Sequence, residues 1–324
     1  MASKPDEVRD DVGLTNLDQP LFDGADATKR DLVDYLDAVS DRILPVLADR
    51  PLSVIRVRPG QDPFMQKNVP KYTPDFVTIE KIWAEASKRE VSYAICDSRK
   101  TLLWFANQRA IEYHVALMRA PKWEHQTHLI LDLDPPEGNE SFGLAVQAAL
   151  LVRQALTDIG LDGAVKTSGA KGVHVYVPID EHASIEDAAA ATRAIAARAE
   201  KIDPQLATTE FVKEHRHGKV FVDSTRAGGA TVVAAYSPRI RPGASVSYPV
   251  GWDDLESVSP QDFTIRNAAG QLGDRDPWAD QLPAPQRLPA DLLAEGHSIP
   301  IARVAAMHEG KRRKNAARKQ SSEQ

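Results

Sequence analysis

A short apolar run that ends in two carboxylates and two prolines constrains the fold of this chain more than any other segment. The run His-Leu-Ile-Leu-Asp-Leu-Asp-Pro-Pro at 128–136 has the length and apolar content of a buried β-strand. Side chains alternate faces along a strand, so Asp132 and Asp134 point the same way. Two like charges on one face need a compensating charge, most often a divalent cation. The pattern predicts either a metal site or a solvated pair at an ordinary strand end.

An aspartyl phosphotransferase is a third interpretation of the same run. Enzymes of that kind also present Asp-x-Asp after an apolar strand, but they normally carry Thr or Ser shortly after the pair. Pro135 and Pro136 occupy that place here. The sequence therefore disfavours an aspartyl nucleophile.

The composition predicts a soluble protein of a reducing, intracellular compartment. A chain of 324 residues with 42% hydrophobic and 27% charged residues can bury a substantial core as one large domain or two of ordinary size. No apolar run approaches the roughly 20 residues that span a bilayer, and residues 1–12 are polar and acidic, unlike a signal peptide. The single cysteine, Cys96, excludes an internal disulfide and a cysteine-based zinc site.

The charge distribution allows a local contact with a phosphate backbone. The formal net charge of −6 argues against a protein that coats nucleic acid through overall positive charge. Basic residues nevertheless cluster at 213–219, at 239–241 and at 311–319. A run of charge is usually only a solvated face, so these clusters by themselves leave the choice open.

The periodicity of apolar residues predicts mixed helices and strands with hairpins in the core. We expect helices at 28–49, 79–88, 103–114, 141–159 and in the Ala-rich segment that Ser184 and Asp187 would cap. We expect strands at 52–57, 93–95, 128–134, 165–178 and 219–223, with 231–234 pairing back on the last of these. Five prolines between 277 and 300 predict an extended segment over the surface, and the last 16 or so residues have a disordered composition.

The hairpin at 166–176 has the composition of an anion-binding turn. Its two glycines let backbone N–H groups approach an anion, while Lys171 supplies a mobile positive charge and Ser168 a hydrogen bond. A plain hairpin turn would also use glycines. Together with three acids at strand ends (Asp132, Asp134 and Asp223), however, the hairpin could hold a triphosphate beside two divalent ions, which indicates nucleotidyl transfer.

Three motifs of the chain resemble those of the archaeo-eukaryotic primase superfamily. The first is the run at 128–135, and the second is the segment Ser-Gly-Ala-Lys-Gly-Val-His at 168–174. The third is Val-Phe-Val-Asp at 220–223, followed by Ala-Tyr-Ser-Pro-Arg at 235–239. Within that superfamily the sequence is most similar to the polymerase domain of bacterial DNA ligase D, the non-homologous end-joining polymerase, and to its stand-alone primase-polymerase relatives. The likeness extends from Leu14 to about Pro300 and includes segments 27–35 and 107–114.

The resemblance implies a fold and a domain organisation. The fold would be an α/β (α+β) primase-polymerase fold, with antiparallel or mixed central sheets flanked by helices. It would occupy residues 14–300, between a flexible N-terminus at 1–13 and a basic, disordered tail at 301–324.

The resemblance also implies roles for individual residues. Asp132, Asp134 and Asp223 would carry catalysis by binding two divalent ions, Mn²⁺ or Mg²⁺. The triphosphate would be surrounded by His114, Ser168, Lys171, Gly172, His174 and Arg239. The DNA would contact Lys29, Arg56, Phe64, Lys67 and Arg216. Without the resemblance, Phe64 fits a core position as well as a base-stacking one, and His114 fits a helix-end histidine bonded within the protein.

The implied function is that of a metal-dependent, DNA-directed nucleotidyltransferase. It would extend primers across short gaps in DNA repair, on gapped, overhanging or primer-template DNA, and would favour ribonucleotides and manganese. End joining or priming with a separate DNA ligase and an end-binding protein is an alternative, and a DNA-binding recruitment module without catalysis is another. We expect a monomer in the bacterial cytoplasm, associated with the nucleoid.

The sequence departs from the ligase-linked polymerases where they grip the 5′-phosphate of a gap. Gln19 stands where a basic residue precedes their first helix, and Ile55 replaces another commonly basic position. Lys29 and Arg56 would then be left to contact the phosphate, with less charge for a mainly Coulombic grip. Because no ligase or phosphoesterase domain is attached, we expect a stand-alone gap-filling polymerase.

Overall fold

The acidic pair of the 128–134 run lies on the central strand of a five-stranded sheet. The computed structural model describes residues 4–84, 88–138, 141–228 and 230–301. The strands of this sheet lie in the order β11, β12, β10, β14, β13. Their bounds, in that order, are Ala164–Thr167, Val173–Pro178, His128–Asp134, Val220–Asp223 and Ala207–Thr208. Neighbouring strands are antiparallel, except that β13 and β14 run parallel.

The register of this sheet places four polar residues in one row across the strands. Lys166 on β11 is opposite His174 on β12, and His174 is opposite Asp132 on β10. Asp132 is in turn opposite Asp223 on β14. Residues that are directly opposite share a face of the sheet, so all four side chains lie on the same face. Strand register thus brings together Asp132 and Asp223, and Asp134 follows two residues after Asp132 on β10.

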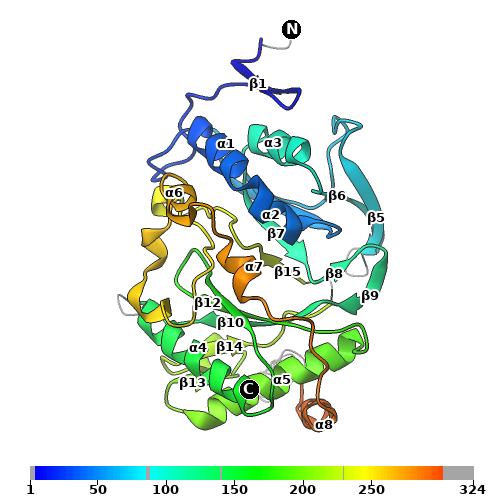
Figure 1. Ribbon diagram of the computed structural model, residues 1–324, viewed down its shortest axis with the longest axis vertical. Coiled ribbons are helices and arrows are strands. Elements are labelled where there is room, and N and C mark those ends of the chain that lie inside the picture. The colour runs from blue at the N-terminus through cyan, green and yellow to red at the C-terminus, as the bar shows by residue number, and fades with distance from the viewer. Residues whose placement is uncertain (1–3, 85–87, 139–140, 229, 302–324) are drawn as a thin grey trace, which may run out of the picture.

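Two long helices cover the sheet, and both were predicted from sequence. Helix α4, Ser141–Thr157, and helix α5, Ile185–Ile202, pack against its strands and against each other. The Ser184 hydroxyl and the Asp187 carboxylate form the expected capping box at the start of α5. A third helix, α8, Ala290–Ser298, packs across α5 (Figure 1).

The second sheet has six strands and lies at the other end of the molecule, beneath three helices (Figure 1). The order is β15, β7, β3, β6, β5, with β4 paired to β3, and every pair is antiparallel. In the order just given, with β4 last, the bounds are Thr231–Val233, Ala110–Ala116, Leu52–Arg58, Arg89–Ile95, Thr78–Ala84 and Gln61–Gln66. The helices are α1, Lys29–Ala38, α2, Ser40–Leu47, and α3, Arg99–Asn107.

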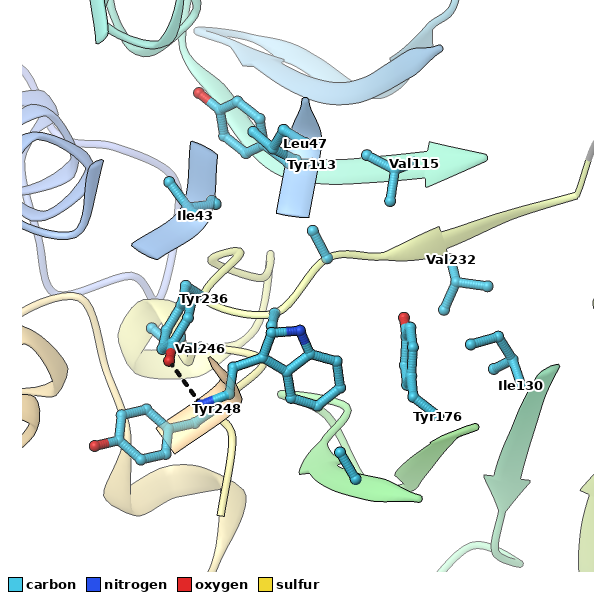
Figure 2. Packing of buried hydrophobic residues seen from close by; sticks show 14 of the residues in the cluster. Ile43, Leu47, Tyr113, Val115, Ile130, Tyr176, Val232, Tyr236, Val246 and Tyr248 are labelled. Atoms are coloured by element: carbon cyan, nitrogen blue, oxygen red, sulfur yellow. Dashed lines mark hydrogen bonds between the residues drawn. The ribbon is translucent and has the colours of Figure 1, made fainter. Parts of the chain in front are cut away.

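One continuous hydrophobic core joins the two sheets. Figure 2 shows Tyr113 of β7 and Val232 of β15 on one side of this core, and Ile130 of β10 and Tyr176 of β12 on the other. Nearby, the Tyr236 hydroxyl accepts a hydrogen bond from the backbone N–H of Trp278 at 3.2 Å (Figure 2). Because apolar side chains fill the space between the sheets, the ends of β10 and β7 are held at fixed positions relative to each other.

The remaining elements are short. The strands β1, Glu7–Arg9, and β2, Val12–Leu14, form one hairpin, and β8, Met118–Arg119, and β9, Lys122–Gln126, form another. Helices α6, Ala268–Leu272, and α7, Pro277–Gln281, follow the sheets. Four 3₁₀ turns span Lys213–His215, Pro242–Ala244, Leu255–Ser257 and Pro260–Asp262. Among the helices described, none has the length and apolar character that crossing a bilayer requires.

Two predicted helices are strands in the structure. The segment 79–88 was expected to be helical, but its described part is β5, because the apolar residues that suggest a helix pair with β6 in register. The expected helix at 103–114 is wrong in its second half. Helix α3 ends at Asn107, Arg109 has a φ of 59°, and strand β7 follows. His114 therefore lies on a strand and not at a helix end.

Several other expectations about strand pairing and element bounds were wrong. Segment 231–234 does not pair with β14, because β15 pairs with β7 of the other sheet. The expected helix at 28–49 is interrupted at Val39, and the proline-rich stretch from 277 to 300 contains α7 and α8. Part of the N-terminus expected to be flexible forms the β1–β2 hairpin, where Arg9 pairs with Asp34 and Asp37 of α1. The basic tail lies outside the described residues.

Candidate active site

Asp132 and Asp223 face each other across the sheet and share one cation. The Arg226 guanidinium donates a hydrogen bond from Nη2 to Asp132 Oδ2 at 3.1 Å, and its Nε lies 3.3 Å from Asp223 Oδ2. The second oxygen of Asp223 accepts hydrogen bonds from the backbone and the hydroxyl of Thr225. Both carboxylates are buried, so the guanidinium compensates charge that water cannot reach.

The protonation equilibria of the acids reflect how close they are to one another. Burial, followed by the charges of Asp132 and Asp223, raises the pKa of Asp134 to about 6. Burial would also raise the pKa of Asp132, but the adjacent His174 ring and the Arg226 guanidinium outweigh burial and lower it. The charges of Asp132 and Asp223 thus act on Asp134, which indicates a site of high negative charge density at the end of β10.

This donor set fits a hard divalent cation. Carboxylate oxygens are the ligands that Mg²⁺ and Mn²⁺ prefer, and the pair Asp132 and Asp223 already holds a positive group between its Oδ2 atoms. In the described part of the chain, no group of three or more His, Cys, Asp or Glu side chains has metal-binding geometry. Asp132 and Asp223 would hold such an ion, and the Arg226 guanidinium now contacts both carboxylates.

The loop at 168–172 wraps tightly around one serine. The Ser168 hydroxyl oxygen accepts hydrogen bonds from the N–H groups of Ala170, at 3.2 Å, and Gly172, at 3.1 Å. A Cβ on Gly172 would lie 2.4 Å from the carbonyl oxygen of Leu133. Gly169 has a φ of 69°, and a Cβ there would lie 2.6 Å from Arg239 Cγ. The loop therefore needs glycine at both positions to approach β10 and Arg239.

The six residues predicted to surround the triphosphate line one cavity of about 990 Å³. They come from three regions of the fold: β7, the β11–β12 hairpin and the loop after β15. The six are His114, Ser168, Lys171, Gly172, His174 and Arg239. Asp132, Asp134 and Arg226 line the same cavity, so the acids and the expected anion contacts face one space. Lys171 extends along the wall to Glu137, with Nζ 2.8 Å from Oε1.

Glu112, which sequence analysis missed, holds two of these residues in place. Its Oε2 lies 2.9 Å from His114 Nε2, and its Oε1 lies 3.2 Å from Arg239 Nε and accepts a hydrogen bond from the N–H of Ile240 at 2.9 Å. Burial would raise the pKa of Glu112, but its contacts with His114, Arg239 and Ile240 lower that pKa to about 2. A permanently ionised carboxylate thus connects β7 with the loop after β15.

Two residues that were expected to contact DNA are buried and bound within the protein. Lys29 donates hydrogen bonds from Nζ to the Thr15 carbonyl, at 2.5 Å, and to Asn107 Oδ1, at 2.7 Å. Burial, together with nearby Arg109, lowers the pKa of Lys29 to about 8. Arg56 is 5% exposed and donates to Gln108 and Gln66. Neither side chain offers a free cation to a phosphate.

The other expected DNA contacts are more accessible. Phe64 on β4 is partly exposed, and the Arg58 guanidinium lies over its ring, 4.8 Å from the centroid. Lys67 is exposed just after β4. Arg216 stacks on Phe221 at 3.8 Å and donates to the carbonyls of Glu210 and Phe211. Phe64 is therefore no core residue, whereas Arg216 is held against the sheet by its own contacts.

A second cavity, of about 880 Å³, contains the position where the sequence departs from the ligase-linked polymerases. Gln19 lies in its wall, and so do Arg58 and Arg109. Arg109 Nη1 donates to Gln19 Oε1 at 3.2 Å, and Nη2 donates to the carbonyls of Pro20 and Leu21. The positive charge that Gln19 lacks is thus present on a neighbouring segment.

The residues missed by sequence analysis left only weak signals. Arg226 stands three residues after Asp223, a spacing at which a side chain can turn back toward an acid. Glu112 stands two residues before His114, so on a strand both side chains share a face. The expectation of a helix at 103–114 concealed that relationship.

Comparisons with known proteins agree with the geometry. A family model described as the LigD primase-polymerase domain matches residues 28–278. The bifunctional non-homologous end joining protein LigD of Bacillus subtilis is 35% identical over 268 residues, which cover 81% of this chain and 42% of that protein. The multifunctional non-homologous end joining DNA repair protein LigD of Mycobacterium tuberculosis (strain H37Rv) is 35% identical over 261 residues, which cover 76% of this chain and 33% of that protein. The chain spans less than half the length of these relatives.

A solved structure shares the fold. The polymerase domain of Mycobacterium tuberculosis Ligase D, in complex with DNA, matches with a TM-score of 0.76 and 32% identity, over 85% of this chain and 98% of that one. The expected mixed helix and sheet architecture is confirmed by this match and by the two sheets. The family model covers most of the chain, and the acids, the glycine hairpin and the fold agree with it: this chain belongs to the LigD primase-polymerase domain family.

Proposed function

We propose that this chain is a DNA-directed nucleotidyltransferase that extends a primer strand across short gaps in DNA repair. One observation supports the proposal above all: Asp132, Asp134 and Arg226, which bridges Asp132 to Asp223, line the same cavity as the glycine hairpin, His114 and Arg239. Carboxylates that bind cations beside an anion-binding turn are what transfer of a nucleotidyl group requires.

The chain's own residues would divide the work. Asp132, Asp134 and Asp223 would hold divalent ions, which when bound supply charge neutralisation and a lowered pKa for the attacking 3′-hydroxyl. Arg239, held by Glu112, and Lys171 would bind the triphosphate with fixed and mobile positive charge. The 3′ oxygen forms a bond to the α-phosphorus while the bond to the β-phosphate oxygen breaks and pyrophosphate leaves. Ser168 shapes the loop against which the phosphates would lie.

We extend three further expectations to this chain on the strength of the family resemblance. They are a preference for Mn²⁺ over Mg²⁺, a preference for ribonucleotides over deoxyribonucleotides, and cooperation with a separate ligase and an end-binding protein at bacterial chromosomal breaks. Phe64, partly exposed beneath Arg58, supports stacking on a template base. Parallel reactions with each metal and each type of triphosphate test the first two expectations.

Primer extension on a gapped duplex tests the main proposal. Asp132→Asn and Asp223→Asn should each reduce extension by at least about 100-fold, more than the 10–100-fold typical of residues outside the metal shell. The matched control is Asp158→Asn, which removes the charge of an aspartate that accepts a hydrogen bond from Gln154 of α4 and does not line the cavity. Full extension by either active-site variant would refute the proposal. Binding of DNA without incorporation under every metal would instead support the recruitment module.

The choice between gap filling and end joining depends on the 5′-phosphate. The second cavity, with Arg58 and Arg109 in its wall, supports recognition of a downstream phosphate despite Gln19. Comparing gapped, overhanging and unprimed substrates, each with a 5′-phosphate or a 5′-hydroxyl, separates the alternatives. A gap-filling enzyme should favour the gapped, phosphorylated substrate.

A further inference from the structure

A lysine lies entirely inside the protein at one end of the polar row. Lys166 has 0% exposure, and its position on β11 is opposite His174 of β12. Its Nζ lies 2.9 Å from His174 Nδ1 and 2.5 Å from Ser247 Oγ, and 5.5 Å from the centroid of the Tyr176 ring. A buried ammonium group costs several kcal/mol unless its surroundings compensate it, so a lysine here needs a reason.

The hydrogen bonds around Lys166 have a defined direction. The Ser247 hydroxyl donates its proton to the Thr167 carbonyl at 2.9 Å, so its oxygen accepts from Lys166. The Tyr176 ring presents its π-face to Nζ, an arrangement that favours a positive charge there. On the other side of the row, His174 Nε2 lies 3.2 Å from the Asp132 carboxylate, which can only accept, so the proton of a neutral ring lies on Nε2 and Nδ1 is free to accept. Lys166 therefore donates to the lone pair of His174 Nδ1.

This direction determines the tautomer of His174. With Nδ1 acting as an acceptor, the single ring proton lies on Nε2. Nε2 lies 3.2 Å from Asp132 Oδ1 and hydrogen-bonds to it, and a carboxylate can only accept. Lys166 thus donates in two directions, to Ser247 on one side and to His174 on the other, and His174 in turn donates to Asp132. This last contact occupies Oδ1 of that carboxylate and leaves Oδ2 for Arg226 or a metal.

We propose that Lys166 is a positioning residue for nucleotidyl transfer, because it fixes His174 as the neutral Nε2–H tautomer and thereby orients the Asp132 carboxylate. This role rests on the proposed function, but the tautomer itself does not. Without the N–H donor of Lys166, either ring nitrogen could carry the proton, and an unprotonated Nε2 would repel Asp132. Histidines that orient a metal ligand commonly have their tautomer set by a partner on the other nitrogen.

The test begins with the tautomer in the unaltered protein. Long-range ¹H–¹⁵N correlation spectra of the metal-free protein, labelled at its nine histidines, report which ring nitrogen is protonated, and His174→Gln identifies the signal. We expect a protonated Nε2 and an unprotonated Nδ1 at pH 7.5. A protonated Nδ1 facing Lys166 would overturn the proposal. This measurement needs no variant of Lys166 and no catalytic activity, so it is independent of the proposed function.

Variants then test the role in positioning. Lys166→Met should leave a mixture of tautomers, reduce kcat about 10–100-fold with a KM for the triphosphate changed less than about 3-fold, and weaken Mn²⁺ binding by calorimetry about 10-fold. Lys166→Arg should restore the Nε2–H tautomer and part of kcat. Ser247→Ala, the control, removes the other partner of Lys166 and should keep the tautomer. An unchanged tautomer and kcat in Lys166→Met would contradict the proposal.

Failure of the two proposals gives different results. If the wild-type protein shows the Nε2–H tautomer but extends no primer with any metal, the proposed function fails while the fixed tautomer stands. If extension is normal and the His174 signal shows Nδ1–H, only the role of Lys166 fails.

Discussion

Asp132 and Asp223 occupy directly opposed positions on β10 and β14, and the Arg226 guanidinium contacts an oxygen of each. The two carboxylates that would hold a divalent ion are thus already paired with an internal cation. If they hold such an ion as proposed, it would compete with Arg226 for the same carboxylate oxygens.

Removing Arg226 should make the site depend more on metal. In Arg226→Gln the buried pair loses its compensating charge, so we expect the metal-free protein to lose about 1–3 kcal/mol of unfolding free energy at pH 7.5. Mn²⁺ should then raise the Tm of the variant more than that of the wild type. Thermal unfolding with and without Mn²⁺ measures both effects. Arg153→Gln, which removes an arginine stacked on Trp252 far from the acids in sequence, is the control. Equal Tm increments in variant and wild type would contradict the competition.

Replacing Asp134 should stabilise the metal-free protein while it abolishes activity. The pKa of Asp134 is raised to about 6, above the value of about 3.9 in an unfolded chain. The folded state thus binds the proton more tightly, so the free energy of unfolding falls as the pH rises from 4 to 6 and stays lower above 6. Asp134→Asn removes this loss, which should add about 1–2 kcal/mol at pH 8 and little at pH 4. Thermal unfolding of the wild type and Asp134→Asn in EDTA at pH 4 and pH 8 measures the gain in stability, and Asp158→Asn is the control. An equal gain in unfolding free energy at both pH values would contradict the raised pKa of Asp134.

Glu112 should matter for nucleotide binding although its carboxylate is fully occupied by protein. Glu112→Gln leaves His114 and Arg239 without the negative charge that holds them, so the KM for the triphosphate should rise about 10-fold. Since the pKa of Glu112 is lowered to about 2, the wild-type stabilisation is present above pH 4.5 and disappears as the pH falls through 2. Steady-state kinetics measure the KM of Glu112→Gln. The control is Glu124→Gln, which removes the charge of an exposed carboxylate. An unchanged KM would show that His114 and Arg239 are held by other contacts.

Arg109 should supply the grip on a downstream 5′-phosphate. Its guanidinium reaches Gln19 in the second cavity, so in Arg109→Gln the advantage of a phosphorylated over a hydroxyl end should fall to nearly one. Binding by fluorescence anisotropy to gapped duplexes with each end measures the ratio at several salt concentrations. Gln19→Lys is the reciprocal variant and should increase the ratio. If the wild type does not distinguish the ends, priming or simple extension becomes the better account.

The parts of the site that follow from local pattern could be predicted from sequence. The alternation along 128–134 and along 219–223 identified strands with acids at their ends, and the glycines at 169 and 172 identified the loop that packs against β10. Strand register, which brings Lys166 into line with Asp132, depends on pairing between distant segments and cannot be read from spacing.

The differences between expectation and structure have the same origin. Lys29 and Arg56 have the charge of surface residues, but carbonyl oxygens of other segments bind them in buried positions, and their contact with DNA stays a prediction. The apolar spacing at 78–84 suggested a helix, and pairing with β6 makes the segment a strand. The segment that local pattern assigned to β14 pairs with β7 as β15, because both edges of β14 are already paired, with β10 and β13.

The path of the chain from β14 to β15 limits how far the two halves of the molecule can separate. Asp223 ends a strand of one sheet, Thr231 begins a strand of the other, and Val233 pairs with His114. The connection at 224–230 includes Arg226 and, fully stretched, would span only about 3.3–3.6 Å per residue. It acts as a tether: together with the shared core, it limits any movement of one sheet relative to the other to what these few residues can span.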